Sequence, residues 1–480
     1  MFQKPKSNLL AMAIGVIAHA AQAAEEPITF TAASGEKVEA FHGTFTVPEH
    51  RANPASRQIT LSYVRFPATG EKHGNPIVYL AGGPGAPGSG TAERQRFPLF
   101  MALRQHGDVI AFDQRGTGQS TRLPHCSSSV TVPIDAPVSD AAYAALYRKA
   151  TVECGAFWQG QGIDLAGYTT LESVQDLSAL RQELGAERIA LWGISYGTHL
   201  ALAALKEIPD EIDRAVLASV EGLDQTVKLP ARTDAYFARV QAAIDTQPKA
   251  KALYPDVAGL MRHVHARLDT TPMIVSIPGT EGETFLLQRG HLQSLASALI
   301  ADPENIALLL SVYSMVDGGD ATLAANLIFR FFDPRPPIGM SAMPTAMDMA
   351  SGISEARFAL VREQAKTALL ADYLNFPMPH VAGVWPGLDL GDDFRTNPKG
   401  DTPVLVLSGT LDGRTYQESQ REATAGLTNA TYVAVRNAGH NLFMASPDVH
   451  QAIHSFLEGN GEIPAEIEID LPDFTVLPPM

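Results

Sequence analysis

The sequence predicts an α/β fold in which a mostly parallel sheet is flanked by helices and interrupted by a large helical insertion. Short apolar runs have the continuous hydrophobicity of strands buried on both faces of such a sheet, at residues 77–80, 109–112, 189–193, 215–220 and 404–407. Helical patterns separate several of these runs, as right-handed crossover connections require. The alternation stops at residue 220 and resumes at residue 404, which places the insertion between late strands.

The first two predicted strands have an alternating pattern, unlike the continuous apolar runs that follow them. Residues 39–47 and 58–66 alternate polar and apolar side chains, which is typical of half-buried strands. The clearest crossover helix covers residues 171–184 and has one apolar face. Thr169 and Glu172 have the spacing of a capping box at its start.

The insertion is mostly helical in its pattern. Amphipathic spacing predicts helices at residues 232–244, 257–268, 291–300, 305–315, 322–332 and 355–374. We therefore predict a catalytic core at residues 24–221 and 401–460, a helical cap at residues 222–400, and an acidic, proline-containing tail at residues 461–480 that runs as extended chain on the surface.

Composition excludes several classes of protein. The chain has 480 residues, of which 45% are hydrophobic and 18% charged, so it can bury a core and is not a disordered protein. Lys and Arg number 36 against 52 Asp and Glu, a net charge of -16 that would repel a phosphate backbone. Nucleic acid is therefore not expected as a partner, and the oligomeric state stays open.

The N-terminus has the pattern of a secretory signal peptide over residues 1–23. Lys4 and Lys6 precede a short apolar run, and Ala21 and Ala23 supply the small residues of a cleavage site. No later stretch is long and apolar enough to span a bilayer. We expect export to the periplasm or the medium, where Cys126 and Cys154 would form a disulfide rather than remain buried thiols.

Residues 193–197 read GISYG and match the GxSxG nucleophile elbow, between a predicted buried strand and a predicted helix. The sharp turn strains the backbone of the nucleophile and leaves room only for small flanking residues. This context makes Ser195 the candidate nucleophile. The alternative is a glycine-rich turn with an incidental serine.

A serine nucleophile needs a base and an orienting carboxylate, which in elbow-containing folds follow in the order Ser, acid, His on loops after later strands. Asp412 follows the strand at residues 404–407, and His440 follows a strand at residues 432–435. Of the 14 histidines, His440 alone follows a late strand on a glycine-containing loop. His199, one turn beyond Ser195, is interpreted as a packed helix residue.

The oxyanion donors of this fold are the amide after the nucleophile and an amide in the loop after an early strand, which here are Tyr196 and Gly83. The same loop also satisfies GxGxxG literally from Gly83 to Gly88. The dinucleotide interpretation fails because Pro84 and Pro87 lack the amide donors that a pyrophosphate needs. We therefore predict no nucleotide or other cofactor.

Three motifs together resemble one known family. Residues 82–85 (GGPG), 113–120 (DQRGTGQS) and 193–198 (GISYGT) resemble the proline iminopeptidase and tripeptidyl aminopeptidase branch of the α/β-hydrolases, and its secreted members are the nearer match. The resemblance covers residues 57–222 and 395–458. It implies a metal-independent serine exopeptidase with a helical cap, acting on peptides with free N-termini. Ala81 departs from the family, where many members have His.

An exopeptidase of this kind must recognise an α-ammonium group, for which a carboxylate is the natural partner. Glu221 and Asp224 follow the strand after the nucleophile helix, at the root of the insertion, and are the candidate anchors. The alternative is that these carboxylates are solvated or belong to a hinge, without a role in substrate binding. The cluster of Asp389, Asp392 and Asp393 is interpreted as a solvated loop, so no metal site is predicted.

These features predict an exported serine exopeptidase that releases N-terminal residues or tripeptides through an acyl-enzyme. One alternative is an esterase or amidase with the same triad that acts on small molecules. The other is a catalytically inactive binding protein, which the complete set of Ser195, Asp412 and His440 disfavours.

Overall fold

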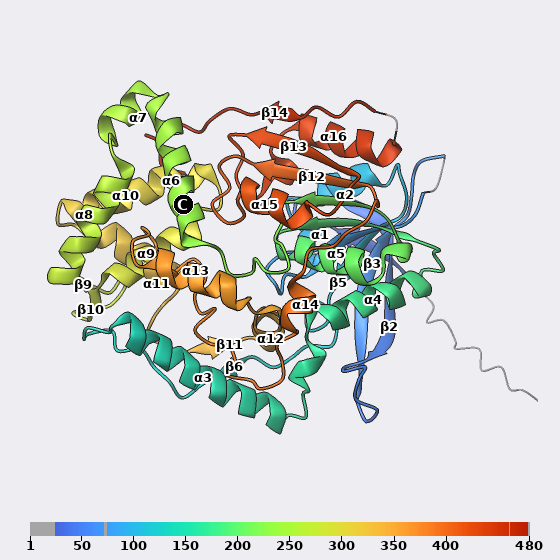
Figure 1. Ribbon diagram of the computed structural model, residues 1–480, viewed down its shortest axis with the longest axis horizontal. Helices are drawn as coiled ribbons and strands as arrows, with labels where there is room; N and C mark the ends of the chain where they lie inside the picture. The colour runs from blue at the N-terminus through green and yellow to red at the C-terminus, as the bar shows by residue number, and fades with distance from the viewer. Residues whose placement is uncertain (1–24, 72–73, 460, 479–480) are drawn as a thin grey trace, which may run out of the picture.

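The computed structural model describes residues 25–71, 74–459 and 461–478 (Figure 1). The predicted signal peptide, residues 1–23, lies outside the described residues. Within these described ranges, no helix has both the length and the apolar character that a bilayer-spanning segment needs.

A ten-stranded sheet forms the centre of the molecule, in the order β1-β2-β3-β5-β4-β7-β8-β12-β13-β14. The first three strands are antiparallel to their neighbours, and every pair from β5 to β14 is parallel. The strands are β1 (Glu26–Thr31), β2 (Lys37–Pro48), β3 (Gln58–Phe66), β4 (Ile77–Leu80), β5 (Val109–Asp113), β7 (Ile189–Ile194), β8 (Ile212–Ala218), β12 (Val404–Gly409), β13 (Ala430–Arg436) and β14 (Glu466–Glu468).

The predicted buried strands are all present, and one boundary was wrong. The strand expected at residues 215–220 is β8, which starts at Ile212 and ends at Ala218. Ser219 has a φ of 54°, a left-handed conformation that cannot continue a strand. The chain therefore turns two residues earlier than its apolar pattern indicates.

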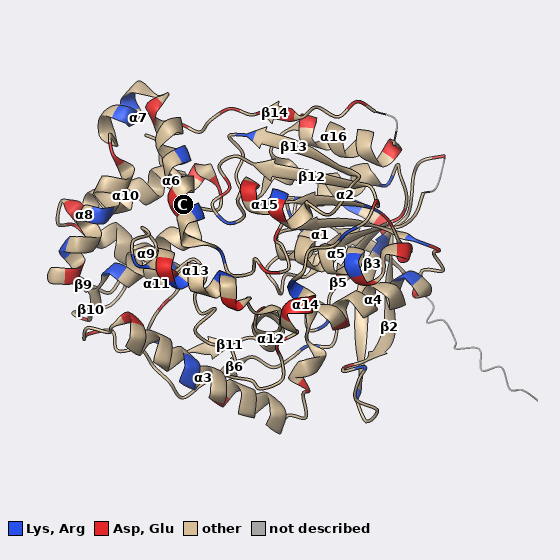
Figure 2. Cartoon of the chain, viewed as in Figure 1, with Lys and Arg blue, Asp and Glu red and all other residues tan. Residues whose placement is uncertain are grey.

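Helices cover both faces of the sheet. One face packs against α4 (Thr170–Glu183) and α5 (Tyr196–Glu207), and the other packs against α2 (Phe97–Leu103) and α16 (Pro447–Glu458). The capping box predicted at the start of α4 is only half formed. Thr169 accepts the amide of Glu172, but the Glu172 carboxylate binds Arg51 instead. Figure 2 shows acidic and basic segments interspersed over these helices and the insertion.

The chain between β8 and β12 forms a helical layer with its own apolar core, seen beside the sheet in Figure 1. The predicted helix at 355–374 was too long: α13 ends at Ala365, and Ala371, with a φ of 47°, cannot belong to a right-handed helix. The main helices are α6 (Pro230–Asp245), α8 (Val257–Thr270), α9 (Arg289–Leu299), α10 (Ile306–Asp317), α11 (Thr322–Phe331), α12 (Ala342–Ser351) and α13 (Glu355–Ala365).

A segment that precedes the nucleophile completes this layer. Strand β6 (Cys126–Ser127) pairs with β11 (Gly339–Met340) of the insertion, and helix α3 (Asp140–Gly160) packs in the same apolar cluster as α12. The predicted disulfide between Cys126 and Cys154 is present and fastens β6 to α3. Two separate stretches of sequence therefore cover the catalytic edge of the sheet.

The C-terminal segment is more ordered than the sequence indicated. It was predicted as extended surface chain, but residues 466–468 form β14, parallel to β13. Further on, Phe474 is buried in the apolar core of the insertion. Its amide donates to the Gln247 side chain at 3.1 Å, and that side chain donates to the Pro472 carbonyl at 2.8 Å.

Breaking the disulfide is expected to destabilise the protein without changing its fold. Closing a loop with a sequence separation of 28 residues is worth about 3–4 kcal/mol in the chain-entropy model. Replacing both Cys126 and Cys154 with Ser should lower the urea midpoint, and reduction of the wild type should do the same. Oxidised, denatured wild type should contain no titratable thiol; two free thiols would contradict the prediction.

Candidate active site

Ser195 lies on the turn between β7 and α5, with a φ of 54° and a ψ of -128°. A non-glycine residue adopts this conformation only where the surroundings enforce it. Both neighbouring glycines are needed, because a Cβ at Gly197 would lie 2.0 Å from the Leu80 carbonyl oxygen and one at Gly193 would lie 2.8 Å from the Gly197 oxygen. The GxSxG spacing therefore brings α5 against β4 with Ser195 at the turn.

Asp412 and His440 come from the loops after β12 and β13 and meet at the same edge of the sheet. His440 Nδ1 lies 3.0 Å from Asp412 Oδ2 and 3.2 Å from Oδ1. This contact occupies Nδ1 and leaves Nε2 as the nitrogen available to a serine. The backbone of His440 is also fixed, since its amide donates to Ala301 and its carbonyl accepts the Ser219 hydroxyl, both at 2.8 Å.

Asp412 is fully buried and surrounded by donors. The Thr415 hydroxyl donates to Oδ2 at 2.6 Å, and the amides of Arg414 and Thr415 donate to Oδ1 at 2.7 and 2.9 Å. Burial would raise the pKa of Asp412, but the His440 imidazole and the Thr415 hydrogen bonds lower it below its usual value. The carboxylate thus stays ionised and can orient the imidazole.

Ser195 and His440 line one cavity of about 430 Å³, together with Gly82, Gly83 and Asn441. No hydrogen bond joins Ser195 Oγ to His440 among the described contacts. Such bonds commonly tighten only when substrate binds. The structure therefore brings the predicted nucleophile and base to one cavity, with the acid fixed behind the base.

The predicted oxyanion elements lie beside Ser195. A Cβ added to Gly82 would come within 3.1 Å of Ser195 Cβ, so the glycine loop passes close to the nucleophile. Gly83 lines the catalytic cavity, and Tyr196 is the first residue of α5. Asp113, at the end of β5, anchors this loop because its carboxylate accepts the amide and hydroxyl of Ser89 and the amide of Gln119.

Helix α12 of the insertion covers the same loop. Pro344 would be 3.1 Å from a Cβ at Gly85, and the Tyr196 hydroxyl donates to Met347 Sδ. His199 is fully buried and contacts Ser351 at 3.0 Å, which ties α5 to the end of α12. This agrees with its interpretation as a packed helix residue.

Glu221 is buried under the insertion, where its carboxylate binds Lys228 Nζ at 2.6 Å. Burial would raise the pKa of Glu221, but Lys228 and His199 lower it below its usual value. Asp348, on α12, lies close enough to Glu221 and Lys228 for both charges to act on its pKa, but the net shift is upward. Burial and the Glu221 charge raise the pKa of Asp348 to about 7.

Asp224 has a different environment from Glu221. Its carboxylate accepts the amide and hydroxyl of Ser354, at 2.8 and 2.5 Å, and Ser354 in turn caps α13. Neither Asp224 nor Glu221 lines the catalytic cavity, but Glu221 lines a small neighbouring cavity that shares Arg414 with it. Its contacts hold the root of the insertion to α13.

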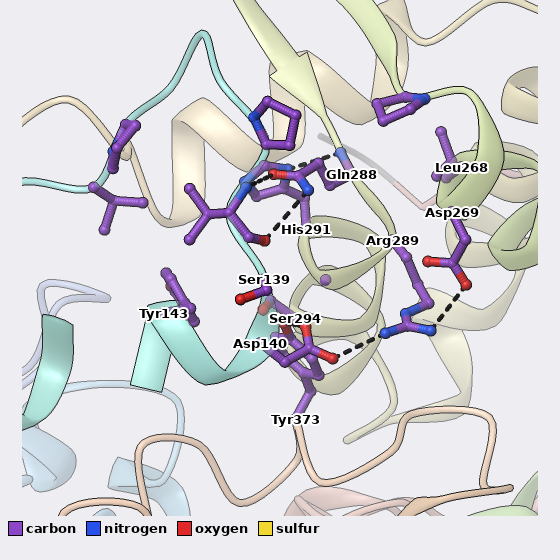
Figure 3. A pocket seen from close by; sticks show the side chains of 16 residues that line it. Ser139, Asp140, Tyr143, Leu268, Asp269, Gln288, Arg289, His291, Ser294 and Tyr373 are labelled. Carbon is purple, nitrogen blue, oxygen red and sulfur yellow. Dashed lines mark hydrogen bonds and ion pairs between the residues drawn. The ribbon is translucent and has the colours of Figure 1, made fainter. Parts of the chain in front are cut away.

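Two further cavities adjoin the catalytic one or each other through shared lining residues. A middle cavity of about 470 Å³ shares Ala298 and Arg414 with it, and a distal cavity of about 410 Å³ shares Tyr143, His291 and Tyr373 with the middle one. In the distal cavity, Arg289 bridges Asp140 and Asp269 at 2.9 Å each (Figure 3). The adjoining cavities give space for a chain several residues long between α3 and the insertion.

Sequence reasoning missed Thr415, Asp348 and two arginines of the catalytic cavity, Arg96 and Arg414. Thr415 has a local signal, because an aspartate commonly accepts hydrogen bonds from residues two and three positions later. Arg414, two positions after Asp412, has the same signal for its backbone amide. Asp348 and Arg96 have none, since only the folded chain brings them to Glu221 and to Ser195. Among the described residues, no group of three or more His, Cys, Asp or Glu could hold a metal ion.

Comparison with known proteins agrees with the observed fold. A family model described as alpha/beta hydrolase fold matches residues 75–447. A tripeptidyl aminopeptidase of Streptomyces lividans is 30% identical over 187 residues, 37% of this chain and 35% of that protein. Serine protease Hip1 of Mycobacterium bovis is 29% identical over 182 residues, covering 36% and 35%. A probable proline iminopeptidase of Streptomyces coelicolor is 30% identical over 159 residues, covering 33% and 37%. Each match thus spans about a third of the relative.

Replacing Ser195 with Ala should abolish hydrolysis while leaving the fold intact. Removing one member of a triad disables the whole unit, so kcat should fall by roughly 10⁴-fold or more. Turnover of an activated ester or amide measures this, with circular dichroism as the control for folding. Near-normal turnover would rule out Ser195 as the nucleophile.

Asp348→Asn should make the protein more stable than the wild type at pH 8, by a margin that shrinks toward pH 4. Because the folded-state pKa of Asp348 is raised to about 7, the native state holds this proton more tightly than the unfolded chain. The free energy of unfolding of the wild type therefore falls as pH rises from about 4 to about 7, and asparagine does not titrate. Melting temperatures across this window test the prediction, and parallel pH profiles would contradict it.

Proposed function

Because this chain belongs to the α/β-hydrolase family, we propose that it is an exported serine exopeptidase that releases N-terminal residues or tripeptides from peptides. The observation that carries the proposal is one cavity lined by Ser195 and His440, with the buried Asp412 fixed behind the imidazole. Relatives named as tripeptidyl aminopeptidase, serine protease and proline iminopeptidase support a peptide substrate. The signal peptide expected at residues 1–23 and the disulfide support export.

The proposed reaction follows from the placement of the side chains. Ser195 Oγ attacks the scissile carbonyl while His440 Nε2 takes its proton, and Asp412 stabilises the imidazolium. The amides of Tyr196 and Gly83 stabilise the oxyanion. His440 then gives the proton to the leaving amine, and a water activated by the same imidazole hydrolyses the acyl-enzyme.

The cover over the site supports cleavage at a chain end. Helix α12 lies against the glycine loop, and the adjoining cavities are lined both by the insertion and by the segment around α3. We propose that this cover admits a peptide by one end, as an exopeptidase requires.

We propose that the substrate α-ammonium binds at the carboxylate cluster of Glu221 and Asp348. The cluster holds two carboxyl groups and one lysine ammonium, that of Lys228, so one negative charge is left when Asp348 is ionised. A substrate ammonium would balance this charge and would stabilise the ionised form of Asp348. The proposed anchor would lie next to the catalytic cavity, because Glu221 lines a small cavity that shares Arg414 with it.

Blocking the substrate amine should slow hydrolysis strongly. Acetylation removes the positive charge and leaves a desolvated carboxylate without its partner, which costs on the order of 2–5 kcal/mol. The kcat/KM of matched free and N-acetylated fluorogenic peptides measures the difference. Glu221→Gln should weaken cleavage of the free peptide and narrow that difference.

Asp224→Asn provides the matched control, because the Asp224 carboxylate binds Ser354 and Asp224 lines neither the catalytic cavity nor the small cavity beside Glu221. Equal cleavage of free and blocked peptides would overturn the aminopeptidase assignment. A strong preference for free peptides that Glu221→Gln leaves unchanged would move the anchor to Asp348. Cleavage of short acyl esters, without cleavage of any peptide, would favour an esterase.

A further inference from the structure

The catalytic cavity carries positive charge in an acidic protein. Two arginines, Arg96 and Arg414, line it beside Ser195 and His440, and no Asp or Glu is among its lining residues. The whole chain has 52 acidic against 36 basic side chains, so a cavity lined by arginine and no carboxylate departs from the composition of the molecule. The positive charge of the two guanidinium groups is therefore not balanced by any carboxylate that lines the cavity.

Arg96 is buried, with 8% of its surface exposed, and has only neutral partners. Its guanidinium donates to the Tyr79 hydroxyl and, at 3.3 Å, to Asn441 Oδ1. The Tyr79 and Phe443 rings lie 5.7 and 5.5 Å from its Cζ and hold the group in place. No carboxylate in the described part of the chain comes within ion-pair distance of it.

Arg414 follows the catalytic Asp412 by two residues, and its guanidinium has one protein partner. Nη1 donates to the Ser297 carbonyl at 2.8 Å, and the other two nitrogens have no acceptor among the described residues. Nearby carboxylates are engaged elsewhere: Asp412 with His440 and Glu221 with Lys228. Arg414 also lines the middle cavity, so it stands where the two cavities meet.

A charge removed from water is costly unless an opposite charge or strong acceptors compensate it. A guanidinium held rigidly by neutral groups, with free donors toward a cavity, is suited to a carboxylate. We propose that Arg96 and Arg414 form a binding site for a carboxylate of the substrate, next to the scissile bond. The proposal rests on the peptidase function above for the reaction that the site serves.

Two sources could supply this carboxylate in a peptide. One is the side chain of an acidic residue beside the scissile bond, and the other is the free C-terminus of a short peptide whose last residue is the leaving group. Both place an anion within reach of the same two arginines. The site would recognise a carboxylate in either case. Substrates that carry the carboxylate at only one of these two positions therefore distinguish the sources.

The experiment compares isosteric substrates that differ in one charge. Peptides with a free N-terminus carry Glu or Gln beside the scissile bond, and each is prepared with a C-terminal carboxylate and with a carboxamide. We expect kcat/KM to be at least about tenfold higher for the carboxylate member of one of the two pairs, as charged hydrogen bonds predict. The pair that shows the preference identifies the source.

Arg414→Gln should reduce that preference at least severalfold and act mainly through KM, whereas Arg414→Lys should retain part of it. Arg96→Gln should act in the same direction, and Arg414→Gln decides alone if that variant does not fold. Arg436→Gln is the matched control, because it removes one positive charge at the exposed end of β13, outside the cavity. This control should leave the preference unchanged.

The same variants are tested on the 4-nitrophenyl monoester of glutaric acid and its uncharged carboxamide analogue. In one outcome, peptides remain uncleaved while the charged ester is hydrolysed faster than its carboxamide analogue in the wild type and not in Arg414→Gln. That result would support the carboxylate site and contradict the peptidase function. The proposal is overturned if the wild type does not discriminate within any pair. It is also overturned if Arg414→Gln lowers kcat/KM equally for both members of each pair.

Discussion

The close approach of α5 to β4 is the contact on which the catalytic arrangement depends. The Gly197 backbone lies directly against the Leu80 carbonyl, where no side chain could fit. This contact forces the chain to leave β7 through a strained turn, which lifts Ser195 above the edge of the sheet. The glycine loop after β4 then passes beside the nucleophile, and the loops after β12 and β13 bring Asp412 and His440 to the same edge.

Local and periodic signals predicted the core of the fold well. The continuous apolar strands and the elbow motif depend on residues that are neighbours in sequence, so they could be read directly. The order Ser195, Asp412, His440 followed because each residue comes after a strand of a parallel sheet, whose carboxyl ends share one edge. Asp412 could also be expected to lie close to His440, since β12 and β13 pair.

Other features were beyond the sequence because they depend on packing between distant segments. The length of α13 was overestimated, since its apolar pattern continues past Ala365 although the backbone turns. Strand β14 was missed because a short acidic strand has almost no periodicity, and pairing with β13 determines it. The pairing of Glu221 with Lys228, like the unpaired state of Arg414, could be recognised only once every charge had a position.

The C-terminal segment connects the two layers mechanically. It leaves the sheet after β14, and Phe474 is buried in the apolar core of the insertion. Helices that separated from the sheet on this side would have to extract an aromatic ring and break both contacts with Gln247. The segment therefore holds the insertion to the sheet on this side of the molecule. On the opposite margin, α3 and α12 share an apolar cluster, and the disulfide fastens β6 to α3.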